Sequence, residues 1–176
     1  MAAGSTYTPI ATTTLGSAQS SVTFSSISGY TDLVLVTVAA TTHSSATFLN
    51  VQFNGDGGTN YSATDLYGNG TSASSARDTN TAKGWLGLDV SISNTLGDNV
   101  TVTNFMNYSS SLTNKTFISR CNRASSSLDY FGTNATVALW RNTAPITSIV
   151  VYNSRGGANY NFSTGSTFTL YGIQAA

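Results

Sequence analysis

Hydrophobic and polar residues alternate along most of this 176-residue chain. In the stretch TFLNVQFN, the apolar residues Leu49, Val51 and Phe53 occupy every second position. A period of two places these side chains on one face of a β-strand and the polar ones on the other face. The pattern therefore predicts a strand over 47–54 that is buried on one face.

The same alternation predicts two more half-buried strands, in WLGLDVSIS and in NVTVTNFMNY. The side chains expected to face the core are Leu86, Leu88, Val90 and Ile92 in the first, and Val100, Val102, Met106 and Tyr108 in the second. The stretch DLVLVTVAA differs, because it is apolar on both faces from Leu33 to Val36. Burial on both faces is typical of a strand inside a sheet, so we expect this one to be central.

Five further strand patterns follow the same rules: SVTFSSI, KTFISRC, ATVALW, ITSIVVYN and STFTLYGI. Clusters of turn-forming residues separate them, such as NGDGG at 54–58 and SRGG at 154–157. No stretch has a convincing helical period. The chain is therefore predicted to be one all-β domain over 1–176, an antiparallel two-sheet sandwich of jelly-roll-like form.

Two segments are expected to depart from the sandwich. Residues 1–16 contain Pro9 and form a predicted extended arm that reaches a neighbouring subunit. Residues 59–83 are polar and poor in large aliphatic side chains, so they are predicted to be a loop excursion, exposed or packed on a neighbour.

Charged residues make up only 8% of the chain, and the formal net charge is zero. There is no Glu, whereas Ser and Thr number 26 and 28. Thr is β-branched and covers the outer face of a strand without charge. Such a surface lacks the basic field that binding to nucleic acid or anionic membranes requires, so neither partner is expected. Its weak charge repulsion suits a crowded assembly.

Candidate chemistry is sparse. His43 is the only histidine, and nothing selects a serine and an aspartate to act with it, so we expect it in a polar loop. Cys121 shares a predicted inner face with Phe117 and is expected to be a buried thiol, although Arg120 and Arg123 offer the positive charge that activates a cysteine. We expect no catalytic residues and no cofactor.

The stretch Asn54–Asn60 spaces its oxygen atoms like a calcium loop, but it lacks the bidentate acid that ends such a loop. A glycine-rich hairpin turn is the favoured interpretation, and cation binding stays open. Zinc lacks ligands, since there is one His and one Cys. No metal site is therefore predicted.

The aromatic residues are candidates for core packing, for protein contacts or for stacking on sugars. Trp85 and Trp140 lie within strand patterns and are expected in the core. The residues proposed for an interface come from the arm and from the polar excursion: Tyr7, Pro9, Ile10, Tyr61 and Tyr67.

The stretch FNGDGGTNYSATDLYGNG and the ending ITSIVVYNSRGGANYNFSTGSTFTLYGI resemble a family of tailed-bacteriophage virion proteins, common in phages of cyanobacteria and marine bacteria. The shared pattern is an Ile-Thr-Ser-Ile strand at Ile146–Ile149, a short hairpin, and a closing strand at Gly165–Ile173. The opening YTPIATTTLGSAQSSVTFSSISGYTDLVLV also matches the start of that family. These strand-and-turn signatures imply a structural module, without catalytic residues to carry over.

The resemblance implies a role in the virion, where such modules form tail fibres, head fibres and capsid decoration proteins, often as jelly-roll trimers. We expect a decoration (cement) protein that binds the major capsid protein and stabilises the head, as a homotrimer. The alternative is a tail-fibre or spike component that binds host-surface glycans through exposed aromatic residues. A glycan-cleaving enzyme is disfavoured, because no two of the seven Asp residues lie close in the sequence.

Overall fold

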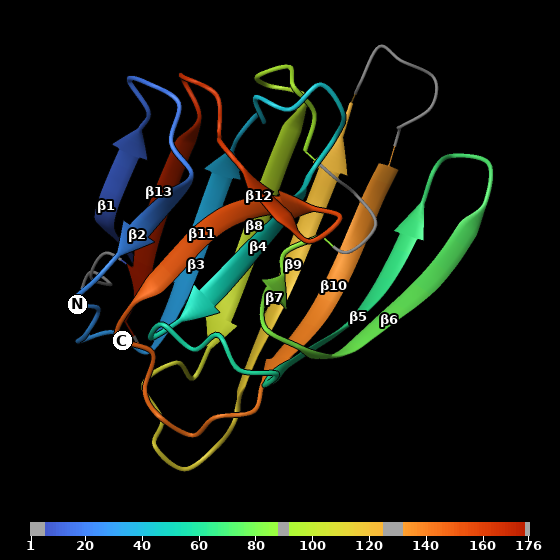
Figure 1. Ribbon diagram of the computed structural model, residues 1–176. Coiled ribbons are helices and arrows are strands. Elements are labelled where there is room, and N and C mark those ends of the chain that lie inside the picture. Colours follow the sequence, from blue (N-terminus) through green and yellow to red (C-terminus); the bar gives the residue numbers. More distant parts are fainter. Residues whose placement is uncertain (1–5, 88–91, 125–131, 175–176) are drawn as a thin grey trace.

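Two antiparallel sheets face each other in this protein (Figure 1). The computed structural model describes residues 6–87, 92–124 and 132–174, and these form thirteen strands without a helix. The strands are β1 (Tyr7–Thr14), β2 (Ser21–Phe24), β3 (Asp32–Val38), β4 (Phe48–Phe53), β5 (Tyr61–Gly68), β6 (Ala73–Thr81), β7 (Gly84–Trp85), β8 (Asn99–Met106), β9 (Lys115–Arg123), β10 (Gly132–Trp140), β11 (Ile149–Arg155), β12 (Ala158–Tyr160) and β13 (Thr167–Ile173). The predicted all-β sandwich is confirmed. In these ranges there is no helix long and apolar enough to cross a bilayer.

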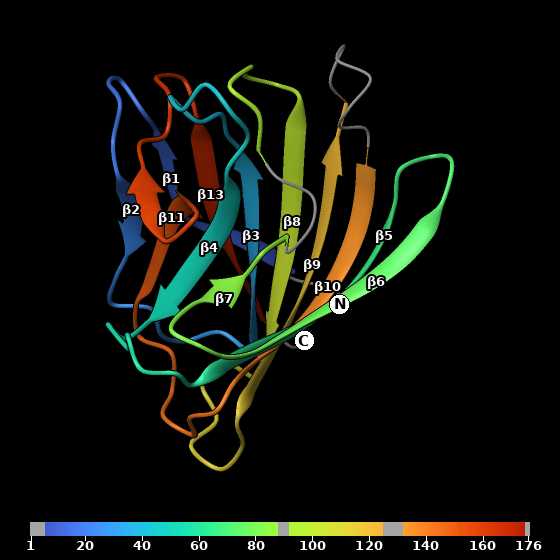
Figure 2. The same ribbon diagram turned by 45° about the vertical axis from the view of Figure 1, so that its right-hand side comes forward.

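The larger sheet has eight strands in the order β1-β13-β3-β8-β9-β10-β5-β6, and the smaller has the order β12-β11-β4-β7, with β2 also paired to β11. The chain passes repeatedly from one sheet to the other, as in the succession β3, β4, β5 and again from β10 to β11. Figure 2 shows that the β5–β6 hairpin extends beyond the area that the smaller sheet covers.

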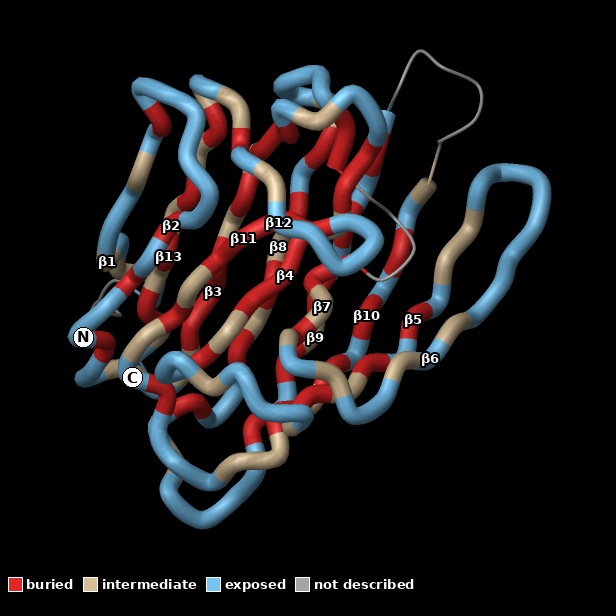
Figure 3. The backbone as a smooth tube through the Cα atoms, in the orientation of Figure 1, coloured by how far each residue is buried: buried red, intermediate tan, exposed pale blue. Residues whose placement is uncertain are grey.

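Aromatic side chains fill the space between the sheets, where Figure 3 shows the buried residues gathered. The ring of Phe53 lies within 5.4–5.6 Å of the rings of Phe105, Phe117 and Trp140. Leu49 and Val51 of the same strand are buried too, as their alternation predicts. Burying each such side chain contributes about 1.5–3 kcal/mol.

The predicted central strand and the closing strand lie side by side in the large sheet. β3 is hydrogen-bonded between β13 and β8, so it lies inside the sheet as predicted, although only the face with Leu33 and Leu35 meets the core, and Val36 faces outward. β13 pairs with β3 on one side and β1 on the other. The apolar end of the chain is thus held inside the sheet.

The N-terminal segment is extended, but from Tyr7 to Thr14 it is an edge strand of the large sheet instead of a free arm, and its contact with a neighbouring subunit stays a prediction. This strand pairs with β13 of the same chain from Tyr7, opposite Ile173, to Thr14, opposite Thr167. The register shifts between Pro9 and Ala11. Proline is tolerated there because β1 is an edge strand and needs no further N–H donor on its free side.

The polar segment 59–83 is a β-hairpin, not the predicted loop excursion. β5 and β6 pair along their whole length and add two strands to the large sheet. Asn69 closes the turn by accepting hydrogen bonds from the amides of Thr71 and Ser72, at 3.0 and 2.8 Å. Ser and Thr occupy both inward- and outward-facing positions of these strands, so the sequence shows no clear alternation of apolar and polar residues here.

β8 presents the opposite face to the core from the one predicted. Thr101 and Thr103 point inward, whereas Val100, Val102 and Met106 point outward. The inward threonines are satisfied, since Thr101 donates to the sulfur of Cys121 and Thr103 shares a 3.0 Å hydrogen bond with Ser119. The ring of Phe105 fixes this choice, because only one face of the strand can place it among the core aromatic rings.

The pattern WLGLDVSIS forms only the two-residue strand β7 and an isolated bridge from Ile92 to Thr47. Leu86 and Ile92 are buried, as predicted. Leu88 and Val90 lie outside the described residues.

Candidate functional site

Most of the exposed large apolar side chains of the described residues lie on the outer face of the large sheet. Seven large hydrophobic side chains are exposed among the described residues, and five of them lie on this face: Tyr7, Leu66, Val100, Met106 and Val137. Val137 is 52% exposed and Leu66 is 63% exposed. We call this surface the apolar face. It is also formed by the exposed Ala135 and by the outward-facing, partly covered residues Val36, Val102, Ile118 and Leu139.

The apolar face holds few charges. Arg120 lies near its centre, where the pairing places it beside Val102 and Ala135. The other charged residues described on this face lie toward its margins: Asp32 at the end of β3 and Arg77 on the edge strand β6. Two hollows, of about 380 and 510 Å³, open on either side of Arg120. Because no element of the described chain covers this face, its aliphatic side chains contact solvent.

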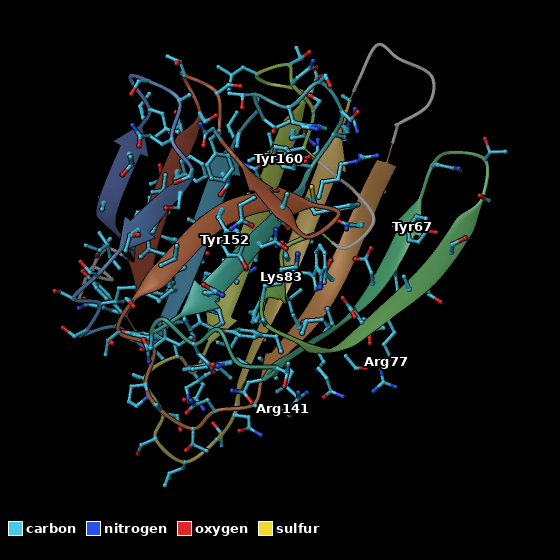
Figure 4. The ribbon with its side chains drawn as sticks, in the orientation of Figure 1. Tyr67, Arg77, Lys83, Arg141, Tyr152 and Tyr160 are labelled. Atoms are coloured by element: carbon cyan, nitrogen blue, oxygen red, sulfur yellow. The ribbon has the colours of Figure 1, made fainter. Side chains whose placement is uncertain are left out.

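The opposite surface of the molecule, the outer face of the small sheet, is polar and hollowed. A pocket of about 410 Å³ opens there, which we call the Tyr152 pocket. Its lining includes Ser21, Gln52, Lys83, Val150, Tyr152 and Asn159. Figure 4 shows Tyr152 on β11 and Lys83 beside β7 on this front surface, below β12.

Lys83 is held at the rim of the Tyr152 pocket by two contacts. Its ammonium donates a 2.8 Å hydrogen bond to the hydroxyl of Ser154, and it lies 4.3 Å from the ring centroid of Trp85. Burial lowers the pKa of Lys83, and the carboxylate of Asp78 opposes that shift. Asp78 itself accepts a 2.9 Å hydrogen bond from the indole N–H of Trp85.

Tyr152 forms the floor of the pocket. Burial raises the pKa of its hydroxyl to about 12, so the group stays protonated and can both donate and accept. Within the described part of the chain no hydrogen bond is made by this hydroxyl, although the residue is only 9% exposed.

The five predicted interface residues are not brought together. Tyr7 is 55% exposed and Pro9 is exposed, whereas Ile10 is half-buried and packs on the core. Tyr67 is half-buried on the far hairpin. Tyr61 cannot contact a partner, so that prediction is wrong.

Tyr61 belongs to the core because it lies, with Ala63, on the inner face of β5. Its ring stacks on Trp140, and its hydroxyl accepts a hydrogen bond from the amide of Phe53 at 3.0 Å. Burial raises the pKa of Tyr61. Trp140 is fully buried as predicted, but Trp85 is only half-buried, since β7 places it on the side of the small sheet away from Val51.

His43 and Cys121 occupy the predicted environments. His43 lies in the loop after β3, where its Nδ1 accepts a hydrogen bond from the amide of Ser45 and its ring packs on Tyr160 at 4.2 Å. Cys121 is 3% exposed, and burial raises the pKa of its thiol to about 11 despite the hydrogen bond from Thr101. A thiol with this pKa is protonated at neutral pH and is a poor nucleophile.

The loop at Asn54–Asn60 is a turn, as predicted, but it connects β4 to β5 in the opposite sheet and closes no hairpin. The carboxylate of Asp56 accepts hydrogen bonds from the amide of Gly58, the side chain of Asn60 and the indole of Trp140, at 2.6–3.2 Å. Burial alone would raise the pKa of Asp56, but these hydrogen bonds outweigh it and lower the pKa. The oxygen atoms that suggested a cation loop are used by protein donors.

Tyr152 is among the aromatic residues that the sequence offers for stacking or contacts, but sequence reasoning missed the pocket around it and a buried carboxylate, Asp65. The carboxylate accepts hydrogen bonds from the Asn134 amide and the Thr136 hydroxyl, both on the neighbouring strand. Across the described ranges, no group of three or more His, Cys, Asp or Glu side chains is arranged to hold a metal ion.

Comparison of the chain with protein-family models, with curated proteins and with solved structures finds no match.

Proposed function

We propose that this protein is a structural component of a tailed-phage virion: a capsid decoration protein that forms homotrimers, binds the major capsid protein and stabilises the head. The apolar face is the observation that carries the proposal. The resemblance of Gly165–Ile173 and the preceding hairpin to phage virion proteins supports it independently.

The size of the apolar face suits a stable interface. Neighbouring strands lie about 4.8 Å apart and rise about 3.3 Å per residue, so the whole outer face of the eight-stranded sheet, polar positions such as Thr64 and Asn104 included, spans roughly 800 Å². A standard protein interface buries about 800 Å² on each partner. The face is therefore large enough to hold an assembly together without covalent chemistry.

A second copy of this chain is the occupant that fits the apolar face best. Burying a charge against aliphatic side chains is unfavourable, so the partner surface must be poor in charge. This chain meets that condition, with 8% charged residues and zero formal net charge. The guanidinium of Arg120 needs hydrogen-bond acceptors, which the Ser- and Thr-rich surface of another copy supplies.

Copy number in the virion tests the proposed location. Densitometry of purified virions should give hundreds of copies per particle, and imaging of the particle should place the density on the head. A stain intensity equal to that of tail-tip proteins would overturn the decoration role and favour the tail-fibre alternative. Binding to capsids stabilises them by mass action, so heads that lack the protein should rupture at a lower temperature.

A further inference from the structure

We infer that the Tyr152 pocket binds a saccharide that carries a carboxylate. This inference goes beyond the proposed structural role and does not depend on it, because the pocket and the apolar face lie on opposite surfaces of the sandwich. The pocket therefore stays open when copies pack through the apolar face. Its volume of about 410 Å³ lies within the usual range for small-molecule sites, about 300–1,000 Å³.

The pocket combines an aromatic floor with an aliphatic neighbour. Tyr152 and Val150 are outward-facing residues of β11, two positions apart. The register places Tyr152 between Ser21 of β2 and Asn50 of β4, so strands on both sides fix its position. A rigid ring of this kind offers apolar contact to one face of a sugar ring while its hydroxyl stays available for hydrogen bonding.

Unused hydrogen-bonding groups surround this floor. Within the described residues, the side chains of Ser21, Tyr152 and Asn159 make no hydrogen bond to the protein, and all three line the pocket. Gln52 donates from its amide nitrogen to the carbonyl of Ala82 at 2.9 Å, which leaves its amide oxygen as an acceptor. Sugar hydroxyls both donate and accept, so they match this mixture of groups.

Lys83 supplies the only charge among the lining residues. An ammonium has three N–H donors, and the protein uses one of them, toward Ser154 at 2.8 Å. No carboxylate of the described chain forms an ion pair with Lys83, although Asp78 lies near enough to raise its pKa. The contact with Trp85 holds the ammonium in place. A carboxylate on the ligand would accept the two remaining donors in charge-assisted hydrogen bonds.

The test is a binding screen of the purified protein on an array of oligosaccharides that contain uronic or sialic acid residues, together with their neutral counterparts. Calorimetric titration of the strongest acidic ligand, its neutral counterpart and inorganic phosphate then measures affinities. We expect the acidic saccharide to bind most tightly and phosphate alone to bind weakly or not at all, because phosphate makes no contact with the aromatic floor.

Two pocket variants and one control locate the binding. Lys83→Met should weaken binding of the acidic saccharide about tenfold, as expected for the loss of a charge-assisted hydrogen bond, and leave the neutral one unchanged. Tyr152→Phe should weaken both saccharides to a similar degree. Arg77→Gln removes a positive charge outside the pocket and should change neither affinity. Circular dichroism confirms that each variant is folded.

Three results would overturn the inference. One is an array on which no saccharide binds. Another is equal weakening by Arg77→Gln and Lys83→Met, because the attraction would then come from overall charge. The third is phosphate binding as tightly as the saccharide, which would make the pocket a simple anion site.

Discussion

Asp56 illustrates how a residue in a ligand-like loop can be used by the fold itself. Its carboxylate links the turn after β4 to Trp140 at the end of β10, with a 2.6 Å hydrogen bond to the indole. Trp140 in turn packs on Phe53 and Tyr61. A surface turn is thereby attached to the aromatic core.

Replacing Asp56 by Ala should lower the free energy of unfolding by about 1–3 kcal/mol, because the buried indole N–H of Trp140 loses its acceptor. Asp56→Asn keeps an acceptor oxygen and should lose less. Urea denaturation followed by tryptophan fluorescence measures both. Equal losses in the two variants would show that the indole hydrogen bond is not the source of the effect.

The lowered pKa of Asp56 predicts how the free energy of unfolding changes with pH. A carboxylate with a folded pKa below its unfolded value of about 3.9 stabilises the protein fully above that value. The stabilisation is lost as the pH falls through the folded pKa. The difference in unfolding free energy between the wild type and Asp56→Asn should therefore be constant above pH of about 5 and shrink below about 4.

The thiol of Cys121 should be unreactive in the folded protein, since burial raises its pKa to about 11. A chromogenic disulfide reagent at pH of about 8 should label it only after denaturant is added, because the thiolate is the reactive form. Complete labelling of the native protein within seconds would contradict the buried position between β8 and β10.

At the scale of elements, the alternating pattern predicted strands well where one face was uniformly apolar. β4 and β13 are such strands, and both lie where expected. The pattern failed on β5, since the inward-facing set that starts at Tyr61 and Ala63 continues with the charged Asp65. Thr136, which is paired with Asp65, and Asn134 on the same neighbouring strand donate hydrogen bonds to that carboxylate, although both are distant in sequence. Hydrogen bonds between strands are invisible to a local pattern.

The candidate surfaces were harder to predict than the strands, for a related reason. β8 has apolar residues on both faces, and only the placement of Phe105 in the core shows that Val102 and Met106 point outward. The Tyr152 pocket is assembled from β2, β4, β11, β12 and the segment before β7, so no single stretch contains its signature. A role for Tyr7 and Pro9 in an interface stays a prediction.

Gly172 of β13 tests how tightly the sheet packs on the loop before β3. A β-carbon at this position would lie 2.2–2.4 Å from ring atoms of Tyr30. Gly172→Ala should therefore lower the free energy of unfolding by about 1–3 kcal/mol through overpacking. Gly16→Ala is the matched control, because a β-carbon there meets no atom within 4 Å, and it should change stability by less than about 0.5 kcal/mol. Equal effects would mean that Tyr30 moves aside freely.

At the scale of the whole molecule, the two outer surfaces of the sandwich differ in chemistry. The large sheet presents aliphatic side chains around Arg120, whereas the small sheet presents the polar Tyr152 pocket. A single chain with these two surfaces can pack against its copies on one side and keep a binding site open on the other. The proposed trimer forms through the first of these surfaces.

Light scattering during size-exclusion chromatography tests that claim most directly. The wild-type protein should elute with about three times the chain mass of 18.3 kDa, and Val137→Asp should elute as a monomer, because burying a carboxylate among the aliphatic side chains of the apolar face is unfavourable. Thr23→Asp, on the opposite sheet, should leave the trimer intact. A wild-type protein that stays at 18.3 kDa at all concentrations, or a Val137→Asp variant that remains trimeric, would contradict the account.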